Sequence, residues 1–416
     1  MDARLEAMGA GGAESRDEHL RSARAALDGR DGLDRRGLLR HAALGAACGA
    51  AATWLGGAAR GLPMQGGSSS IVAKSPSRVV LVAFAGGVRT KETFGRLDNI
   101  PNLKRIADAG VLHTRARSAN LGHYGAALSI FTGVAEQRGI RENSRGDQPT
   151  VFELVRKELA LSASEAWITT AGGAQQVNYS HGLHPDYGAR YGATTLDGDG
   201  VFNREFKGLL ERYGRPREWP AGEKDALALV RRSISGGGAE AERRIAANER
   251  VEQWILSELT RGTAELTGAN AADAKALRLA RNLVTLFKPR LTAVVLQEAD
   301  MAHGNYGGYV EVVRRNDAAI GELWTAIQSD AELAATTTLV VVPEFGRDRD
   351  LNSRRGLDHG DGSDDLNYVT CLCAGPGLRR GAVVKDEVGV VDVAPTVCDL
   401  LGAKGRGGRK LPQLRA

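Results

Sequence analysis

Three short runs of almost entirely apolar residues, 79–84, 291–296 and 338–342, constrain most strongly how this chain of 416 residues folds. Their Val- and Leu-rich composition is typical of parallel strands that are covered on both faces. Segments with apolar residues at helical spacing lie between such runs, so strands and helices alternate along the chain. The sequence therefore predicts an α/β fold with a mostly parallel central sheet flanked by helices.

Acidic and histidine residues follow the second and third runs. Asp300 and His303 come after the second run, Glu344 comes just after the third, and Asp358 and His359 follow shortly beyond. Open α/β sheets bind ligands outside the carboxyl ends of their strands, so we expect these side chains to converge there. Each of them alone is as easily a solvated loop residue. Together they favour a pocket for a divalent metal, and zinc, manganese, calcium and magnesium all fit these ligand types.

Further patterns extend the alternation along the chain. Residues 202–287 depart from it, because Glu, Arg, Ala and Leu dominate there and the helical periodicities are long, which predicts a helical insertion over the sheet. A single domain is expected over residues 61–416. The other predicted helices are 101–110, 150–160, 309–328 and 393–401, another ends at Gly133, and the other predicted strands are 111–117, 165–170 and 368–374.

The distribution of charged residues and the number of cysteines exclude some classes of function and structure. The net charge is +5, but Lys and Arg alternate with Asp and Glu along the sequence, so no nucleic-acid partner is expected. Of the four cysteines, Cys371, Cys373 and Cys398 lie beyond residue 60, and an odd number fits no complete disulfide framework. Cys371 and Cys373 alternate within a predicted strand, so both are expected on one buried face.

The first part of the chain carries an export pattern. Arg35 and Arg36 precede two leucines and then an uncharged, Ala- and Gly-rich run over residues 42–59, which is typical of a twin-arginine signal. We therefore expect residues 1–60 to be a leader, the twin-arginine export machinery to be a partner, and the mature chain to be periplasmic or secreted. The run is long enough for a membrane anchor, but its Ala and Gly content makes spanning marginal, so no stable membrane span is expected in the mature chain.

Seven short motifs occur along the chain in a defined order. They are Gly86-Gly87, Pro101-Asn-Leu103, Phe131-Thr132-Gly133, Asp300 with His303, Glu344-Phe-Gly-Arg347, Asp358-His359-Gly360 and Val391-Asp392. In this order they resemble the alkaline phosphatase and sulfatase superfamily, over residues 78–402 except the helical middle. The resemblance is closest to an exported branch with twin-arginine signals and a Glu-Phe-Gly-Arg motif. It implies one or two divalent ions at the strand ends and hydrolysis of phosphate or sulfate esters.

The resemblance also implies roles for individual residues. Arg347 would bind a small anionic ester substrate through two parallel hydrogen bonds from its guanidinium. His123 is a candidate proton donor to the leaving group, although a histidine at a helix end is more commonly bonded to the backbone. The implied metal ligands are Asp300, His303, Glu344, Asp358 and His359.

Several positions depart from the superfamily pattern. Residues 85–87, Ala-Gly-Gly, replace the aspartate expected after the first strand, and Glu92 is the nearest acid that could serve as a ligand instead. Phe345 stands where a histidine is usual and cannot bind a metal. No Cys-x-Pro-x-Arg motif occurs, which disfavours an ordinary sulfatase. Ser118 is a candidate nucleophile, although a serine at a helix start is more commonly a cap.

Two functions remain open at this level. The first is a metal-dependent, exported hydrolase of phosphate or sulfate esters. The alternative is an exported, noncatalytic binding protein that keeps the fold with a degenerate metal site, because the fold alone does not decide function. A third hypothesis is a helix-rich scaffold that binds a protein partner.

Overall fold

Strand β1 (Arg78–Phe84) lies inside a nine-stranded sheet in the computed structural model, which describes residues 77–136, 145–170, 179–197, 254, 263, 266–268 and 271–415. The strand order is β4-β3-β5-β1-β6-β7-β2-β8, and β9 pairs with β2. Strand β7 is antiparallel to β6 and β2, whereas the other pairs are parallel. The strands after β1 are β2 (Val111–Arg117), β3 (Ala166–Thr170), β4 (Thr194–Asp197), β5 (Leu291–Leu296), β6 (Thr337–Pro343), β7 (Tyr368–Ala374), β8 (Ala382–Val384) and β9 (Val388–Gly389).

Three central strands end at the same level. In the parallel register, Phe84 of β1 lies beside Leu296 of β5 and beside Pro343 of β6. The backbone continues this alignment past the strands, because the N–H of Ala85 donates to Leu296 and the N–H of Glu344 donates to Phe84. The loops that follow β1, β5 and β6 therefore leave the sheet from one edge.

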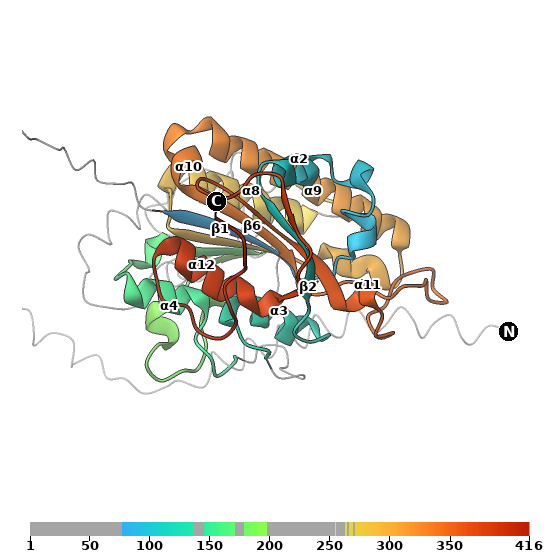
Figure 1. The fold of residues 1–416 in the computed structure, drawn as a ribbon, viewed down its shortest axis with the longest axis horizontal. Helices are drawn as coiled ribbons and strands as arrows, with labels where there is room; N and C mark the ends of the chain where they lie inside the picture. Colours follow the sequence, from blue (N-terminus) through green and yellow to red (C-terminus); the bar gives the residue numbers. More distant parts are fainter. Residues whose placement is uncertain are drawn as a thin grey trace, which may run out of the picture. The chain divides into compact units, whose positions relative to one another are not determined.

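Helices cover both faces of this sheet (Figure 1). Val79 and Leu81 of β1 pack in a core with α3, α4 and α12, whereas Val80 and Val82 pack in a second core with α2, α8 and α9. Burial on both faces explains why these strands read as continuous apolar runs. The described helices are α2 (Pro101–Asp108), α3 (His123–Thr132), α4 (Val151–Glu158), α8 (Ala271–Phe287), α9 (Tyr306–Ser329), α10 (Ala331–Thr336), α11 (Asp364–Asn367) and α12 (Val393–Leu401).

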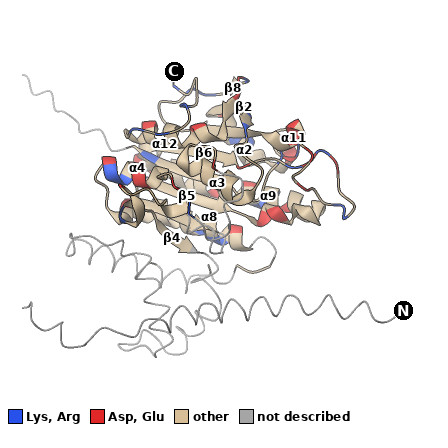
Figure 2. Cartoon of the chain, turned by 90° about the horizontal axis from the view of Figure 1, so that it is seen from below, with Lys and Arg blue, Asp and Glu red and all other residues tan. Residues whose placement is uncertain are grey.

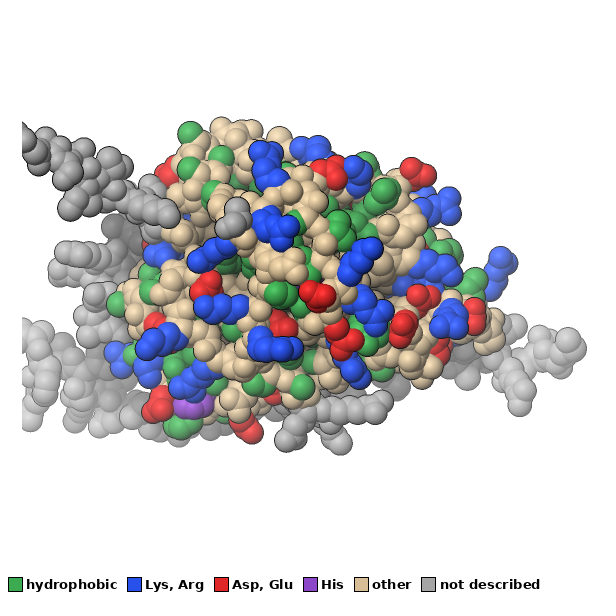
Figure 3. Space-filling view, in the orientation of Figure 1, with side chains coloured by type: hydrophobic (Ala, Val, Ile, Leu, Met, Phe, Trp, Pro, Cys, Tyr) green, Lys and Arg blue, Asp and Glu red, His purple; other side chains and the backbone are tan. Residues whose placement is uncertain are grey.

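The charged side chains lie around this apolar interior. Figure 2 shows Lys, Arg, Asp and Glu mainly on the outer helices and loops. On the face drawn in Figure 3, both signs of charge are interspersed. Among the described residues, none of the helices is both long and apolar enough to cross a membrane.

The predicted fold class is confirmed, and most predicted elements are present. Strands β5 and β7 and helix α12 have the predicted bounds. Helix α9 begins at Tyr306, before the predicted start at residue 309, because the side chain of Asn305 accepts the N–H of Gly308 and caps the first turn. Strands β8 and β9 were not predicted, since three and two residues are too short to show a pattern. Cys371 and Cys373 are buried in one core, as predicted.

Two predicted segments lie largely outside the described residues. The predicted leader, residues 1–60, is not among them, and neither is most of the predicted insertion over residues 202–287. The last part of that predicted insertion is helix α8. Its buried side chains pack in the same core as β5 and α9, so α8 is one of the helices that cover the sheet.

A buried carboxylate ties α8 to the segment that follows β5. Asp273, in the first turn of α8, accepts the backbone N–H of Gln297 at 2.8 Å and that of Glu298 at 3.3 Å. It also accepts Nδ2 of Asn316, on α9, at 2.8 Å. Burial raises the pKa of Asp273 to about 7, although these donors oppose the shift. Asp273 therefore anchors the backbone just before Asp300.

Asp273 is expected to make stability depend on pH. Its pKa is higher in the folded chain than the ordinary value of 3.8, so the folded state holds this proton more tightly than the unfolded state. Its contribution to the unfolding free energy therefore falls as pH rises from about 4 to about 7, by at most about 1.4 kcal/mol per pH unit, and is constant above that range. Urea denaturation of the natural chain and of Asp273→Asn should show a difference in unfolding free energy that changes over this interval. A difference that stays constant across the interval would contradict the raised pKa.

Candidate metal centre

Acidic side chains from two strand ends reach the edge where β1, β5 and β6 finish. Glu344 follows β6 directly, and its side chain is fully buried. Asp300 and His303 lie on the 3-10 helix η7 (Glu298–His303), which follows β5. The common level of the strand ends therefore brings residues from distant parts of the sequence together, as the sequence predicts.

Three histidines complete this group. His123 is the first residue of α3, and His359 lies on the loop between β6 and α11. One nitrogen each of His123, His303 and His359 lies within 4.8 Å of those of the other two. Their ring centroids are 4.7 Å (His123 to His359), 5.0 Å (His303 to His359) and 6.5 Å (His123 to His303) apart. We call these three residues the histidine cluster.

Glu344 holds the ring of His123. Its Oε1 atom lies 2.6 Å from Nδ1 of His123. On the other side of the ring, Nε2 lies 3.0 Å from Oδ1 of Asp300 but makes no well-aligned hydrogen bond. Oε2 of Glu344 is buried and has no hydrogen-bond partner among the described residues. The pair therefore contains two buried polar atoms that the protein does not fully satisfy.

Asp358 holds the ring of His303 in the same way. Its Oδ1 atom lies 2.6 Å from Nδ1 of His303, and its Oδ2 accepts Nδ2 of Asn352 at 2.9 Å. Nε2 of His303 faces Asp300 at 3.3 Å and Arg347 Nη1 at 3.2 Å. Because an arginine can only donate, Nε2 of His303 accepts and Nδ1 carries the proton. Asn352 was not predicted as a site residue, and its place within a loop gives no sequence pattern that would mark it.

The charges of this group compensate one another. Burial would lower the pKa of His123, but the carboxylates of Glu344 and Asp300 outweigh it and raise this pKa to about 10. Burial raises the pKa of Glu344, against the effect of His123. Burial would also raise the pKa of Asp300, yet His123 and Arg347 hold it below its usual range. Burial and the neighbouring cations lower the pKa of His359 to about 4, so this imidazole is neutral at pH 7.

Phe345 forms an apolar wall of the histidine cluster. The side chain is fully buried, and its ring centroid lies 4.9 Å from that of His123 and 5.0 Å from that of His359. Phe345 cannot ligate a metal, as the sequence predicts. It packs against two of the imidazoles and limits the positions that their rings can take.

The guanidinium of Arg347 points into the protein. The side chain is fully buried, and Nη2 donates to Oδ1 of Asp300 at 2.7 Å and to the carbonyl of Gly86. Nε donates to the carbonyl of Gly87 and Nη1 to that of Leu357, both at 3.3 Å. These contacts correct the prediction that Arg347 grips an anionic substrate in a fork, because its donors are directed at the protein.

Glu92 is placed in a different group from the histidine cluster. Its two carboxylate oxygens accept Nη2 and Nε of Arg89 at 2.5 and 2.8 Å, and both side chains are almost fully buried. Tyr306 Oη donates to the same carboxylate at 3.2 Å. This arrangement corrects the prediction that Glu92 replaces the missing aspartate, because both of its oxygens are used by Arg89.

Ser118 does not cap helix α3. The helix begins at His123 with Gly122 as its N-cap residue, and the N–H of Ser118 donates to the carbonyl of Asn367 at 2.9 Å. The Ser118 hydroxyl is buried, and within the described residues no hydrogen bond joins it to the histidine cluster. His123, in turn, contacts two carboxylates through its ring rather than the backbone. Of the three predicted catalytic side chains, His123, Ser118 and Arg347, only His123 belongs to the histidine cluster.

The donor set of this pocket fits a divalent ion. Histidines that bind metals commonly donate their second ring nitrogen to a carboxylate, which fixes the tautomer and the ring direction. His123 and His303 have this arrangement, with Nδ1 on a carboxylate and Nε2 toward Asp300. The three histidines would hold the ion, with Asp300 beside them. Glu344 and Asp358, predicted as ligands, are placed as partners of the ligand rings.

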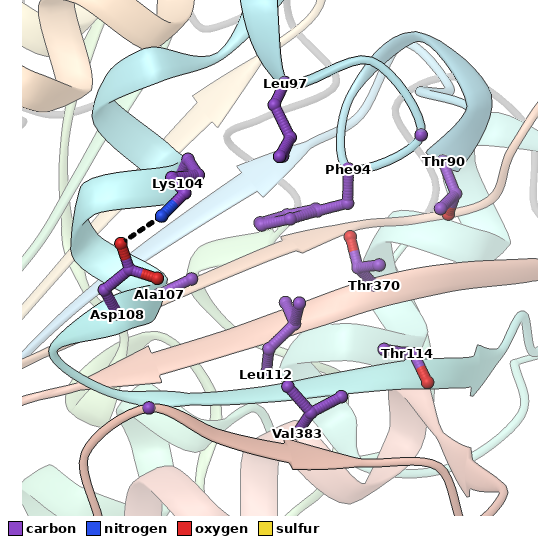
Figure 4. A pocket seen from close by; sticks show the side chains of 12 residues that line it. Thr90, Phe94, Leu97, Lys104, Ala107, Asp108, Leu112, Thr114, Thr370 and Val383 are labelled. Carbon is purple, nitrogen blue, oxygen red and sulfur yellow. Dashed lines mark hydrogen bonds and ion pairs between the residues drawn. The ribbon is translucent and has the colours of Figure 1, made fainter.

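A separate apolar pocket of about 400 Å³ lies over the β2, β7 and β8 end of the sheet (Figure 4). Phe94, Leu97, Leu112 and Val383 contribute much of its apolar lining. None of the residues that line it belongs to the histidine cluster. The polar site and the apolar pocket are therefore different places on the molecule.

Comparisons with known proteins identify the family and the fold. A sequence profile described as "Type I phosphodiesterase / nucleotide pyrophosphatase" matches residues 87–349. No curated protein matches the chain. Among solved structures, wild type alkaline phosphatase PafA is similar with a TM-score of 0.54 at 10% identity, covering 83% of this chain and 100% of that chain. A 2-O GAG sulfatase is similar with a TM-score of 0.50 at 12% identity, covering 82% of this chain and 74% of that chain. At these identities the likeness shows the fold.

Gly87 is expected to be required for the position of Arg347. Gly87 has a φ of +66°, and a Cβ built there would lie 2.8 Å from Nε of Arg347 and 2.8 Å from the ring of Phe345. Gly87→Ala is therefore expected to lower the unfolding free energy by about 2–4 kcal/mol, from backbone strain and overpacking together. Gly377→Ala is the matched control, since its φ is +74° and nothing lies within 4 Å of its Cβ. Equal losses for the two variants in urea denaturation would contradict the tight fit.

Proposed function

This chain belongs to the type I phosphodiesterase / nucleotide pyrophosphatase family, within the alkaline phosphatase and sulfatase superfamily, and from this premise we propose that it is a divalent-metal-dependent hydrolase of phosphate or sulfate esters. The superfamily predicted from the sequence motifs is confirmed. The family description makes phosphodiesters the first substrates to test. Metal dependence and the choice of ester are the proposed parts.

One observation carries the proposal. Three imidazoles converge at the strand ends, and carboxylates already hold two of them with Nε2 directed at Asp300. A solvated loop histidine has no need of a buried carboxylate partner, whereas a metal ligand gains orientation and basicity from one. The fully buried Glu344 beside His123 is therefore best explained as support for a ligand.

Zinc is the ion that this donor set favours. Three imidazoles with an open fourth position are a common catalytic zinc set, whereas calcium and magnesium prefer oxygen ligands. Binding of zinc would release the proton that Glu344 and Asp300 hold on His123. His359 already has a lowered pKa and is neutral at pH 7. Glu344 and Asp358 each use one carboxylate oxygen on an imidazole, which leaves Oε2 of Glu344 as an oxygen unpartnered within the described residues beside three histidines, fewer oxygens than a calcium site usually has.

The residues of the site divide the remaining work. A divalent ion in this place supplies a Lewis acid for the nonbridging oxygens of the ester. Asp300 receives Arg347 on its Oδ1 atom and stays ionised, so it is a fixed negative charge beside the histidine cluster. Glu344 and Asp358 keep the imidazole rings in place, and Phe345 excludes water from one side of them. No side-chain nucleophile is assigned, so a water molecule is the proposed attacking group.

A noncatalytic binding protein is the second candidate. It is favoured by the replacement of the aspartate expected after β1, because residues 85–87 contribute only backbone groups there and Arg347 occupies two of their carbonyls. A protein of this kind would bind an anionic ester without hydrolysing it. A hydrolysis assay separates the two candidates.

Asp300→Asn is expected to lower hydrolysis of bis(4-nitrophenyl) phosphate by at least about 10-fold, because even an outer carboxylate of a metal site commonly contributes that much. The assay is run with added zinc, and 4-nitrophenyl phosphate and 4-nitrophenyl sulfate are compared in parallel. Asp350→Asn is the control. It makes the same chemical change at an exposed position on the loop after Arg347. Equal rates for the two variants would reject Asp300 as a site residue, and no hydrolysis of any ester would favour the binding protein.

We also propose that the chain is exported by the twin-arginine pathway, on the basis of Arg35, Arg36 and the weakly apolar run that follows them. Changing both arginines to lysine keeps the charge but removes the arginine pair, so unprocessed chain is expected to accumulate in the cytoplasm of a bacterium that has this pathway. The control changes Arg21 and Arg24 to lysine in the same leader. Cell fractionation and immunoblotting measure the result, and unchanged export of the first variant would contradict the proposal.

A further inference from the structure

We propose that the guanidinium of Arg347 is a built-in cation of the site, so that the histidine cluster takes one divalent ion and Arg347 fills the place of a second. This inference rests on the proposed metal-dependent function. It concerns the number of ions and the residue that fixes it. The argument uses the contacts of Arg347, the supply of ligands and the balance of charge.

The contacts of Arg347 are those of a bound cation. Four oxygen atoms receive its donors, namely Oδ1 of Asp300 and the carbonyls of Gly86, Gly87 and Leu357, and Nη1 also lies 3.2 Å from Nε2 of His303. Backbone carbonyls and a carboxylate are also the ligands of hard metal ions. The side chain is fully buried, and a planar guanidinium serves several acceptors at once, so its charge has one fixed position.

The turn after β1 is shaped for this guanidinium. A Cβ at Gly86 would lie 2.5 Å from the carbonyl oxygen of Gln297 and 2.7 Å from the backbone nitrogen of Asp300. A Cβ at Gly87 would meet Nε of Arg347 at 2.8 Å. The turn therefore presents bare backbone to Arg347 on one side and to the start of η7 on the other. A larger side chain, including an acidic one, does not fit at either position without a shift.

The remaining ligand atoms are sufficient for one ion. Within the described part of the chain, the histidine cluster is the one group of three or more His, Cys, Asp or Glu residues whose ligand atoms lie this close together. Oδ1 of Asp300 already receives Arg347 at 2.7 Å. Nδ1 of His123 and Nδ1 of His303 are each 2.6 Å from a carboxylate, so each of these rings has only Nε2 to offer. A second ion bound to Oδ1 of Asp300 and to the carbonyls of the turn after β1 would have to displace Arg347.

The balance of charge agrees with a single ion. Asp300 and Glu344 bring two negative charges, Arg347 brings one positive charge, and ligand imidazoles are neutral. One divalent ion then leaves one net positive charge, which a singly charged ester neutralises. Two divalent ions would leave three positive charges close together in a half-buried site, and like charges at such distances repel one another. The charge of Asp358 is offset separately by Arg354 at 3.0 Å.

The test is the number of zinc ions bound by the full chain. The purified protein is saturated with zinc, dialysed and measured by elemental mass spectrometry, with calorimetric titration as a second readout. One zinc ion per chain is expected. Two ions, or none, would overturn the inference. The hydrolysis assay reports on the proposed function separately, since two ions with hydrolysis reject only the inference, and one ion without hydrolysis rejects only the function.

Arg347 variants test the role of the guanidinium directly. Arg347→Met removes the positive charge and leaves Oδ1 of Asp300 and the two glycine carbonyls without Arg347. The number of zinc ions bound per chain is therefore expected to rise from one to two. Arg347→Lys keeps a charge and is expected to stay at one. Arg349→Met, an exposed arginine on the same loop, is the control and is also expected to stay at one. A folded Arg347→Met protein that still binds one ion would overturn the stand-in role, and if this variant does not fold, the count in the natural chain decides.

Discussion

The common level at which β1, β5 and β6 end is the constraint on which the site depends. Their parallel register places Phe84 beside Leu296 and Pro343, so the next residues of three distant segments leave the sheet together. Burial of both faces fixes this register, because a slip by one residue would exchange the side chains of the two cores. The apolar strands, although they contribute no ligand, therefore decide where Asp300 and Glu344 lie.

Buried charges are the second constraint, and they explain why cations and acids alternate around Asp300. Glu344 is fully buried, and an unpaired carboxylate in such a place would be strongly destabilising. His123 lies 2.6 Å from Glu344, and Arg347 lies 2.7 Å from Asp300, so each acid has a cation beside it. Arginine suits this position better than lysine, because its planar fork reaches carbonyls of the β1 turn and a carboxylate of η7 at the same time.

The sequence predicts the sheet well and the site in part, for physical reasons. A short apolar run bounded by turns and rich in β-branched residues is typical of a covered strand, and the bounds of β5 and β7 are predicted to the residue. Loops that follow neighbouring parallel strands leave the sheet at one edge, so Asp300, His303 and Glu344 are predicted together. Which charged side chains pair with one another is not predicted in this way, because it depends on the direction of each side chain. Nothing in the sequence shows that Glu92 bonds to Arg89, three residues before it, or that Arg347 turns inward.

Side-chain direction also separates ligands from their supports. A carboxylate near an imidazole is compatible with both roles, and the sequence treats Glu344 and Asp358 as ligands. In the structure each lies 2.6 Å from an Nδ1 atom, where it fixes the tautomer and turns Nε2 toward Asp300. The rings of His123 and His303 are therefore oriented before any ligand arrives, which reduces the entropy lost on binding. The same residue types thus act by positioning, and the local backbone, set by the strand ends, determines which role each one takes.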